Sequence, residues 1–230
     1  MKSVFVSLLS LLTGVSAWAQ TGFFAEAGVG HLSLSGAKYS IANVALSSSG
    51  GNTVPGTAGP FTTNDSFSRE DDHATVPFIA AGYTFSENLG LRFTYHHIGD
   101  LTTIADYDVI IGGDAVAGSV HTVFQDTTRL FTLSPEFSWS VNQTIELTVS
   151  PELNLVLNRA TITTTTDDVS IMIVPTSPYS DESVTFGGSA DVKFHLSPQA
   201  SLVVRYKYTD LKPSRDRTGH LISASLRWHF

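Results

Sequence analysis

Apolar and polar residues alternate with a period of two along much of this chain. The clearest case runs from Ile145 to Asn158, where every second residue is apolar and the residues between them are polar, with only Val156 breaking the polar set. Strict alternation is the signature of a β-strand whose two faces meet different surroundings. This segment is therefore predicted to be a strand with one apolar and one polar face.

Eight segments show this alternation, although the first two are weaker because they are rich in Gly and Ala. They cover residues 22–34, 74–85, 89–96, 131–141, 145–158, 184–196, 202–209 and 220–230. Short turns of turn-forming residues follow at 86–88, 142–143 and 197–199, whereas long links lie at 36–73, 100–121, 160–182 and 210–217. The pattern predicts an all-β, up-and-down antiparallel transmembrane β-barrel of about eight strands, with short periplasmic turns and longer extracellular loops.

A soluble barrel would also alternate, so the charges decide which face is inside. The polar face carries ten ionisable residues, five acidic and five basic, and an enclosed lumen needs that balance because unpaired buried charge is costly. They are Glu26, Arg92, Glu136, Glu146, Glu152, Asp191, Lys193, Arg205, Lys207 and Arg227. Aromatic residues also gather near the short turns, as at a membrane interface. We therefore expect a membrane barrel whose lumen is filled by a charge network.

The N-terminus predicts export. The three parts of a signal peptide are present as Lys2, an apolar run from Val4 to Val15 and the small residues around Trp18. We expect the signal peptide over residues 1–19 and the barrel domain over 20–230. The 230 residues include no cysteine, which excludes disulfides, thiolate metal sites and a cysteine nucleophile. The formal net charge of −8 argues against a nucleic-acid partner, and most of the acids fall in the long links, which predicts acidic extracellular loops.

With this leader, these hairpins and a last strand at 220–230, the chain resembles the small outer-membrane barrels of Gram-negative bacteria, the OmpA/OmpX-like group. The resemblance implies location in the cell outer membrane, among its lipid and lipopolysaccharide. It also implies that the last strand is an assembly signal read by the barrel assembly machinery. The residues that would form this signal are Ile222, Ala224, Leu226, Trp228 and Phe230.

A near-repeat is the most specific feature of the polar face. Ser134-Pro135-Glu136-Phe137 and Ser150-Pro151-Glu152-Leu153 flank the turn at 142–143, which would place the prolines opposite each other and the glutamates on a diagonal. Two close carboxylates can act as an acid/base pair. We favour a structural cluster, in which Arg92, Arg205 or Arg227 bridges them by forked hydrogen bonds. The prolines remove ladder donors and predict a bulge or weakened pairing.

Two further patterns contain residues that can carry chemistry. His195-Leu196-Ser197 has the spacing of a His/Ser pair, but it lies at a predicted periplasmic turn with no evident carboxylate to orient it. His96 and His97 beside Asp100 could suggest a metal site, but adjacent strand residues point to opposite faces. We therefore expect no enzyme activity, no cofactor and no metal.

The sequence favours a structural and surface-interaction protein, a plugged barrel that displays its loops to an extracellular ligand the sequence does not identify. The alternative is a narrow ion-conducting channel through the polar interior. A lipid A-modifying enzyme is the third possibility considered.

Overall fold

The computed structural model describes residues 21–35, 61–70, 73–111, 115–166, 179–212 and 217–230, and the predicted signal peptide lies outside them. Regular structure in these ranges is entirely β, and they contain no helix that could cross a membrane. The strands are β1 (Gly22–Ser35), β2 (Phe61–Glu70), β3 (His73–Ser86), β4 (Leu89–Ile111), β5 (Ala115–Ser140), β6 (Ile145–Thr166), β7 (Tyr179–His195), β8 (Ala200–Lys212) and β9 (Arg217–His229).

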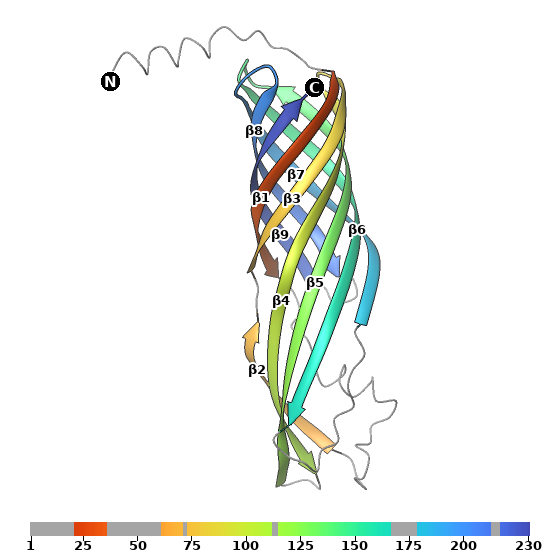
Figure 1. Cartoon of the computed structure of the whole chain (residues 1–230), viewed down its shortest axis with the longest axis vertical. Helices are drawn as coiled ribbons and strands as arrows, with labels where there is room; N and C mark the ends of the chain where they lie inside the picture. Colours follow the sequence, from red (N-terminus) through yellow and green to blue (C-terminus); the bar gives the residue numbers. More distant parts are fainter. Residues whose placement is uncertain (1–20, 36–60, 71–72, 112–114, 167–178, 213–216) are drawn as a thin grey trace, which may run out of the picture.

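Eight of these strands close into an antiparallel up-and-down barrel (Figure 1). Around the ring the order is β1, β3, β4, β5, β6, β7, β8 and β9, and β9 pairs back onto β1. The turns after β3, β5 and β7 lie at one end of the barrel together with Phe230, and we call this the short-turn end. Closure leaves the ring without a free edge, so its backbone hydrogen bonds are made between strands. The predicted fold class is confirmed.

The strands continue far beyond the predicted segments at the opposite end. β4, β5 and β6 project past the rest of the barrel, and β2 adds a ninth strand by pairing with the outer part of β4 (Figure 1). The links predicted at 36–73, 100–121, 160–182 and 210–217 are therefore partly strand. Five of the acids predicted for loops lie in strands instead, namely Glu70, Asp106, Asp108, Asp181 and Glu182. The alternation rule missed them because this part of the sequence is rich in Thr, Asp and Gly and carries no sustained apolar stripe.

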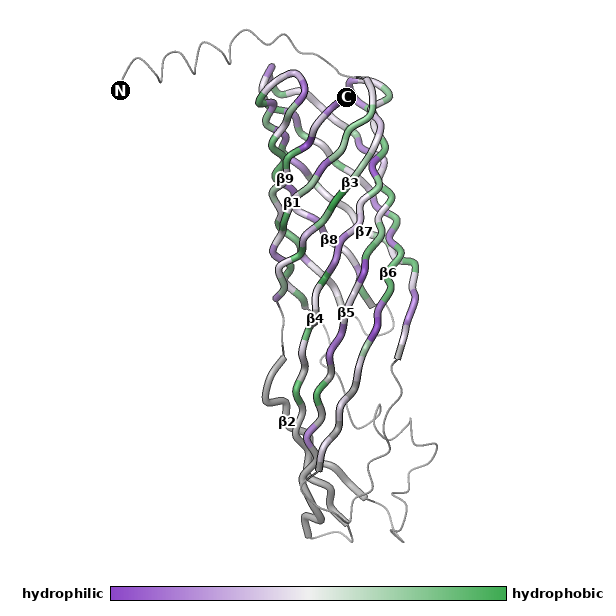
Figure 2. The backbone as a smooth tube through the Cα atoms, in the orientation of Figure 1, coloured by the Kyte–Doolittle hydropathy of each residue, from purple (hydrophilic) through white to green (hydrophobic). Residues whose placement is uncertain are grey.

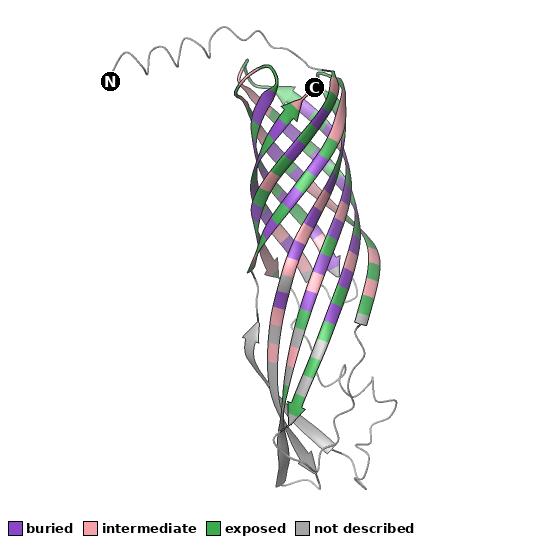
Figure 3. Cartoon of the chain, viewed as in Figure 1, coloured by how far each residue is buried: buried purple, intermediate pink, exposed green. Residues whose placement is uncertain are grey.

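Within the barrel, the faces are the reverse of those in a soluble protein. Hydropathy and burial alternate residue by residue along the strands (Figures 2 and 3), and the buried set is mainly polar or charged while the large apolar side chains are exposed. On β6, Glu152 is buried and Leu153 is exposed. The apolar outward positions of β6 run from Ile145 to Leu157, which at about 3.3 Å per residue and a tilt of about 40° covers about 30 Å, the thickness of a bilayer core.

The two prolines of the near-repeat lie opposite each other on β5 and β6. Pairing is continuous up to Leu133 with Leu153, stops for three positions and resumes at Phe137 with Val149 in the same register. Neither Pro135 nor Pro151 has an N–H to donate, so the ladder is interrupted there. Of the two expectations for this site, weakened pairing is what the structure contains, and there is no bulge in this ladder.

Candidate functional site: the closed lumen

All ten predicted charge-network residues project into the lumen. Nine are buried and Glu146, next to the turn at the short-turn end, is partly buried. They come from every strand of the ring except β3, because alternation directs one face of each strand inward.

Arg227 and Glu136 join opposite walls of the barrel. β9 and β5 are separated by three strands in either direction around the ring. The Arg227 Nη1 lies 2.9 Å from Glu136 Oε2 and its Nη2 lies 2.8 Å from Glu136 Oε1, a forked pair. The same guanidinium donates through Nε and Nη2 to Glu26 and stacks 4.0 Å from the centre of the Phe24 ring. One arginine therefore contacts both sides of the lumen.

Arg92 connects Glu136 to two further carboxylates. Its Nη1 lies 2.7 Å from Glu136 and 2.9 Å from Asp191, and its Nη2 lies 3.5 Å from Glu152. Glu136 and Glu152 are diagonal neighbours in the register, so Arg92 lies between the two glutamates of the near-repeat. Each glutamate is held by cations, which is the arrangement of a structural cluster rather than of two carboxylates sharing a proton.

Two cations of β8, Arg205 and Lys207, join this strand to the network. Arg205 makes a two-pronged contact with Asp191 at 2.9 Å for both atoms, and its Nη2 reaches Glu26 at 3.0 Å. Lys207 lies 2.7 Å from Glu152 and donates to Thr132. Each of these cations pairs with at least one carboxylate, so burial leaves none of them uncompensated.

The network reaches the short-turn end through Lys193. Its Nζ lies 2.7 Å from Glu146 and 3.8 Å from Glu136. A pocket opens at this end, and its lining includes Glu136, Glu146, Lys193, His195 and His229. We call this pocket the vestibule. It opens the short-turn end of the lumen as far as Glu146, Lys193 and Glu136 of the network.

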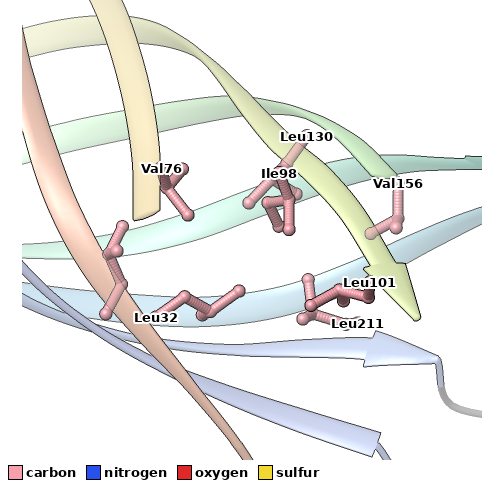
Figure 4. Close-up of a cluster of buried hydrophobic side chains, with 8 residues drawn as sticks. Leu32, Val76, Ile98, Leu101, Leu130, Val156 and Leu211 are labelled. Carbon is pink, nitrogen blue, oxygen red and sulfur yellow. The ribbon is translucent and has the colours of Figure 1, made fainter. Parts of the chain in front are cut away.

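Beyond the charge network the lumen contains a buried apolar cluster, which the predicted charged lumen did not anticipate, beside the hydrogen-bonded pair Thr128 and Asn158. A cluster of eight buried aliphatic side chains, here called the apolar cap, packs together inside the barrel at this level (Figure 4). Val156, the residue that broke the alternation, is fully buried in it. The other members are Leu32, Val76, Ile98, Leu101, Leu130, Leu211 and Leu221. In the sequence only Val156 stood out on a polar face, and one apolar residue does not predict a cluster.

The two histidine patterns resolve differently. His96 is buried in the lumen against Phe78 while His97 lies on the outer face, so the two side chains cannot bind the same metal ion. The described residues contain no cluster of His, Asp and Glu that could hold a metal. His195 does have a carboxylate, because its Nε2 lies 3.3 Å from Glu146 and its Nδ1 is 3.0 Å from the Ser201 hydroxyl. Sequence reasoning missed both partners, since they lie on neighbouring strands.

This Ser–His–Glu relay does not present a nucleophile. Ser201 is 1% exposed and is absent from the lining of the vestibule, so a substrate carbonyl could not reach its hydroxyl. The nearby Ser197 instead accepts a hydrogen bond from the Ala200 N–H within the turn. The relay therefore ties the end of β7 to β6 and β8.

The five residues of the predicted assembly signal face outward along the last strand. Ile222, Leu226 and Trp228 are exposed large apolar side chains, and Ala224 is exposed between them. Phe230 is 78% exposed, and its N–H donates to the Phe23 carbonyl at 2.9 Å, so it extends the seam between β9 and β1.

The apolar outer face, the closed ring and the lumen occupied by side chains define an integral membrane barrel. The family model of the outer membrane protein beta-barrel domain matches residues 5–230. The chain therefore belongs to this family. It is therefore a protein of the cell outer membrane, as predicted. No curated protein matches the chain.

Several solved structures are similar in outline. Neisserial surface protein A is 14% identical, with 93% of this chain and 99% of that chain covered and a TM-score of 0.49. Ail, the attachment invasion locus protein of Yersinia pestis, is 12% identical, with 92% and 100% covered and a TM-score of 0.48. The outer membrane protease OmpT from Escherichia coli is 7% identical, with 94% and 99% covered and a TM-score of 0.41. The family match, not these likenesses, carries the assignment.

Proposed function

We propose that this protein is a sealed barrel that anchors a β-sheet platform on the cell surface, with a structural and surface-interaction role rather than a transport or catalytic one. The observation that carries the proposal is the double closure of the lumen. An ionic network with the Arg227–Glu136 pair spans it, and the apolar cap lies in it beyond the network.

The filled lumen argues against the narrow-channel alternative. An ion entering from the vestibule meets a network in which each charge is already paired, and then meets an aliphatic cluster that offers no ligands. Passage would require breaking several buried ion pairs and wetting the apolar cap. Both steps are unfavourable in a low-dielectric interior.

The platform is the outer continuation of β4, β5 and β6 together with β2. These strands remain hydrogen-bonded after the other walls of the barrel have ended, so the barrel holds a sheet beyond its rim. A sheet held in this way can present a partner with a defined surface, which supports a role in surface interaction.

Planar-bilayer recording of the purified full-length protein tests the proposal. We expect no step-like openings, while a general diffusion porin recorded in parallel shows that the bilayers are competent. Steady, reproducible openings from the barrel would overturn the sealed-lumen proposal and favour the channel. Lipid A mass spectra that change on overexpression of the protein would instead favour an enzyme.

A further inference from the structure

The outer wall of the barrel changes character at one level. From the short turns outward, the outward-facing positions carry no charged side chain until a ring of polar residues is reached near the apolar cap. The ring consists of His31, Thr75, His97, Arg129, Arg159, Glu182, Asp210 and His220. Members of the ring directly precede members of the cap in sequence, as His97 precedes Ile98 and Arg129 precedes Leu130. Here charged and polar residues appear on the outside while the apolar cap lies inside, whereas nearer the short turns the outside is apolar and the inside charged.

This inversion marks where the bilayer core ends. A wall in contact with acyl chains is apolar outside, whereas a wall in contact with headgroups or water is polar outside and can bury apolar residues within. The ring therefore lies at the headgroup level of the leaflet farther from the short turns. With the turns periplasmic, as in barrels of this type, that leaflet is the outer one.

Two arginines lie side by side in this ring. Arg129 of β5 faces Leu157 of β6, and Arg159 of β6 faces Thr127 of β5, so the arginines are diagonal neighbours on the same outward face. Such neighbours are about 7–8 Å apart. Both are exposed, and neither is paired with a carboxylate of the described residues. His97 of β4 lies directly opposite Arg129.

An apolar floor lies immediately below the arginines. Phe131 packs against Phe93 and Tyr95, with ring centres 6.2 and 5.0 Å apart. Leu155 faces Phe131 across the strands and is exposed. The wall therefore places a pair of cations above an aromatic and aliphatic surface, which complements an anionic headgroup on acyl chains.

The rest of the ring differs in charge. On β7, Glu182 faces Leu157 and is a diagonal neighbour of Arg159 on the other side, and on β8 the corresponding outward position carries Asp210. The cationic face is therefore confined to β4, β5 and β6, and a uniform attraction to any anionic surface does not account for it.

We propose that this face is a binding site for the phosphorylated lipid A of lipopolysaccharide, with Arg129 and Arg159 contacting a phosphate, His97 beside them and the Phe131 floor contacting acyl chains. Guanidinium groups suit phosphate because they donate two hydrogen bonds in a plane. The site lies on the outer wall, so it is independent of whether the lumen is sealed.

Binding of the full-length protein in nanodiscs to bisphosphorylated lipid A tests the site. We expect the double variant R129Q/R159Q to bind at least about tenfold more weakly, since two charge-assisted contacts are lost. The matched control is K212Q/R217Q, which removes two cations from a cross-strand pair of β8 and β9, on other strands of the ring. It should leave the affinity nearly unchanged.

Lipid A without its phosphates should bind the native protein as weakly as bisphosphorylated lipid A binds R129Q/R159Q. Equal losses in the two double variants, or equal binding of dephosphorylated lipid A, would overturn the proposal. Equal binding of phosphatidylglycerol would overturn the assignment to lipid A. Heat-modifiable gel migration shows whether each variant is folded, and the single variants R129Q and R159Q carry the comparison if the double variant does not fold.

Discussion

Arg227 of β9 and Glu136 of β5 meet across the whole width of the barrel through two hydrogen bonds of 2.8 and 2.9 Å. The two residues are 91 positions apart and lie on opposite walls, so only closure of the sheet brings them together. The pair bridges the lumen, and it makes the stability of the barrel dependent on charges far apart in the sequence.

Removing the charge of Glu136 should destabilise the barrel strongly. The variant Glu136→Gln leaves Arg92 and Arg227 with fewer anionic partners in a buried site, and we expect a loss of about 3–5 kcal/mol. Urea unfolding in lipid vesicles measures it. Glu87→Gln makes the same chemical change in an exposed turn and should shift stability by less than about 0.5 kcal/mol. Similar small effects at both positions would contradict a stabilising network.

The apolar cap predicts a contrast between two leucines of β5. Leu130 is buried in the cap and Leu133 is 43% exposed on the outer face. We expect Leu130→Ala to cost about 2–5 kcal/mol, because it leaves a cavity in a packed interior. Leu133→Ala should cost less, because lipid can fill the space vacated. The same unfolding measurement decides, and equal costs would count against the cap as a packed unit.

The interrupted ladder predicts a stabilising double substitution. Replacing Pro135 and Pro151 by Val supplies two N–H donors where pairing between β5 and β6 stops, while keeping apolar side chains on the outer face. At about 0.5–1.5 kcal/mol per hydrogen bond, we expect a gain of about 1–3 kcal/mol. Pro198→Val lies in an exposed turn, adds no ladder donor and should not stabilise. A double variant no more stable than the native barrel would show that the gap has another cause.

Phe230 should matter for insertion more than its exposed area alone explains. Phe230 and Phe186 are 78% and 76% exposed, so truncating either to Ala removes a similar outward aromatic surface. If the last strand is read during assembly, Phe230→Ala lowers the outer-membrane yield while Phe186→Ala does not. Quantitative blotting of outer-membrane fractions checks this. Equal yields of the two variants would refute a special role for Phe230.

The absence of cysteine makes the topology directly testable. A cysteine at Thr163, exposed in the outer part of β6, should react with a membrane-impermeant maleimide on intact cells. A cysteine at Glu87, exposed in the turn between β3 and β4, should react only after the outer membrane is permeabilised. The reverse pattern would invert the barrel and move the proposed lipid A site to the inner leaflet.

Sequence alone could predict most of the barrel because alternation is a local property. β6 and β9 were recognisable because each residue faces either lipid or lumen, so every second position is apolar. β2 and the outer parts of β4 and β5 could not be predicted in this way. Outside the membrane, neither face of a strand has to be apolar, so the pattern that marks a membrane strand is lost.

The candidate sites divide along the same line. The sequence alone determined that ten charged residues would face one side of the strands and that an apolar stripe would face the other. Only the tertiary structure decided that Arg227 reaches Glu136, that Val156 belongs to an apolar cap, and that Arg129 and Arg159 stand together on the outer wall. Which face a residue takes depends on its own position in a strand. Its partners depend on the register and closure of the whole sheet, which bring together residues that are far apart in the chain.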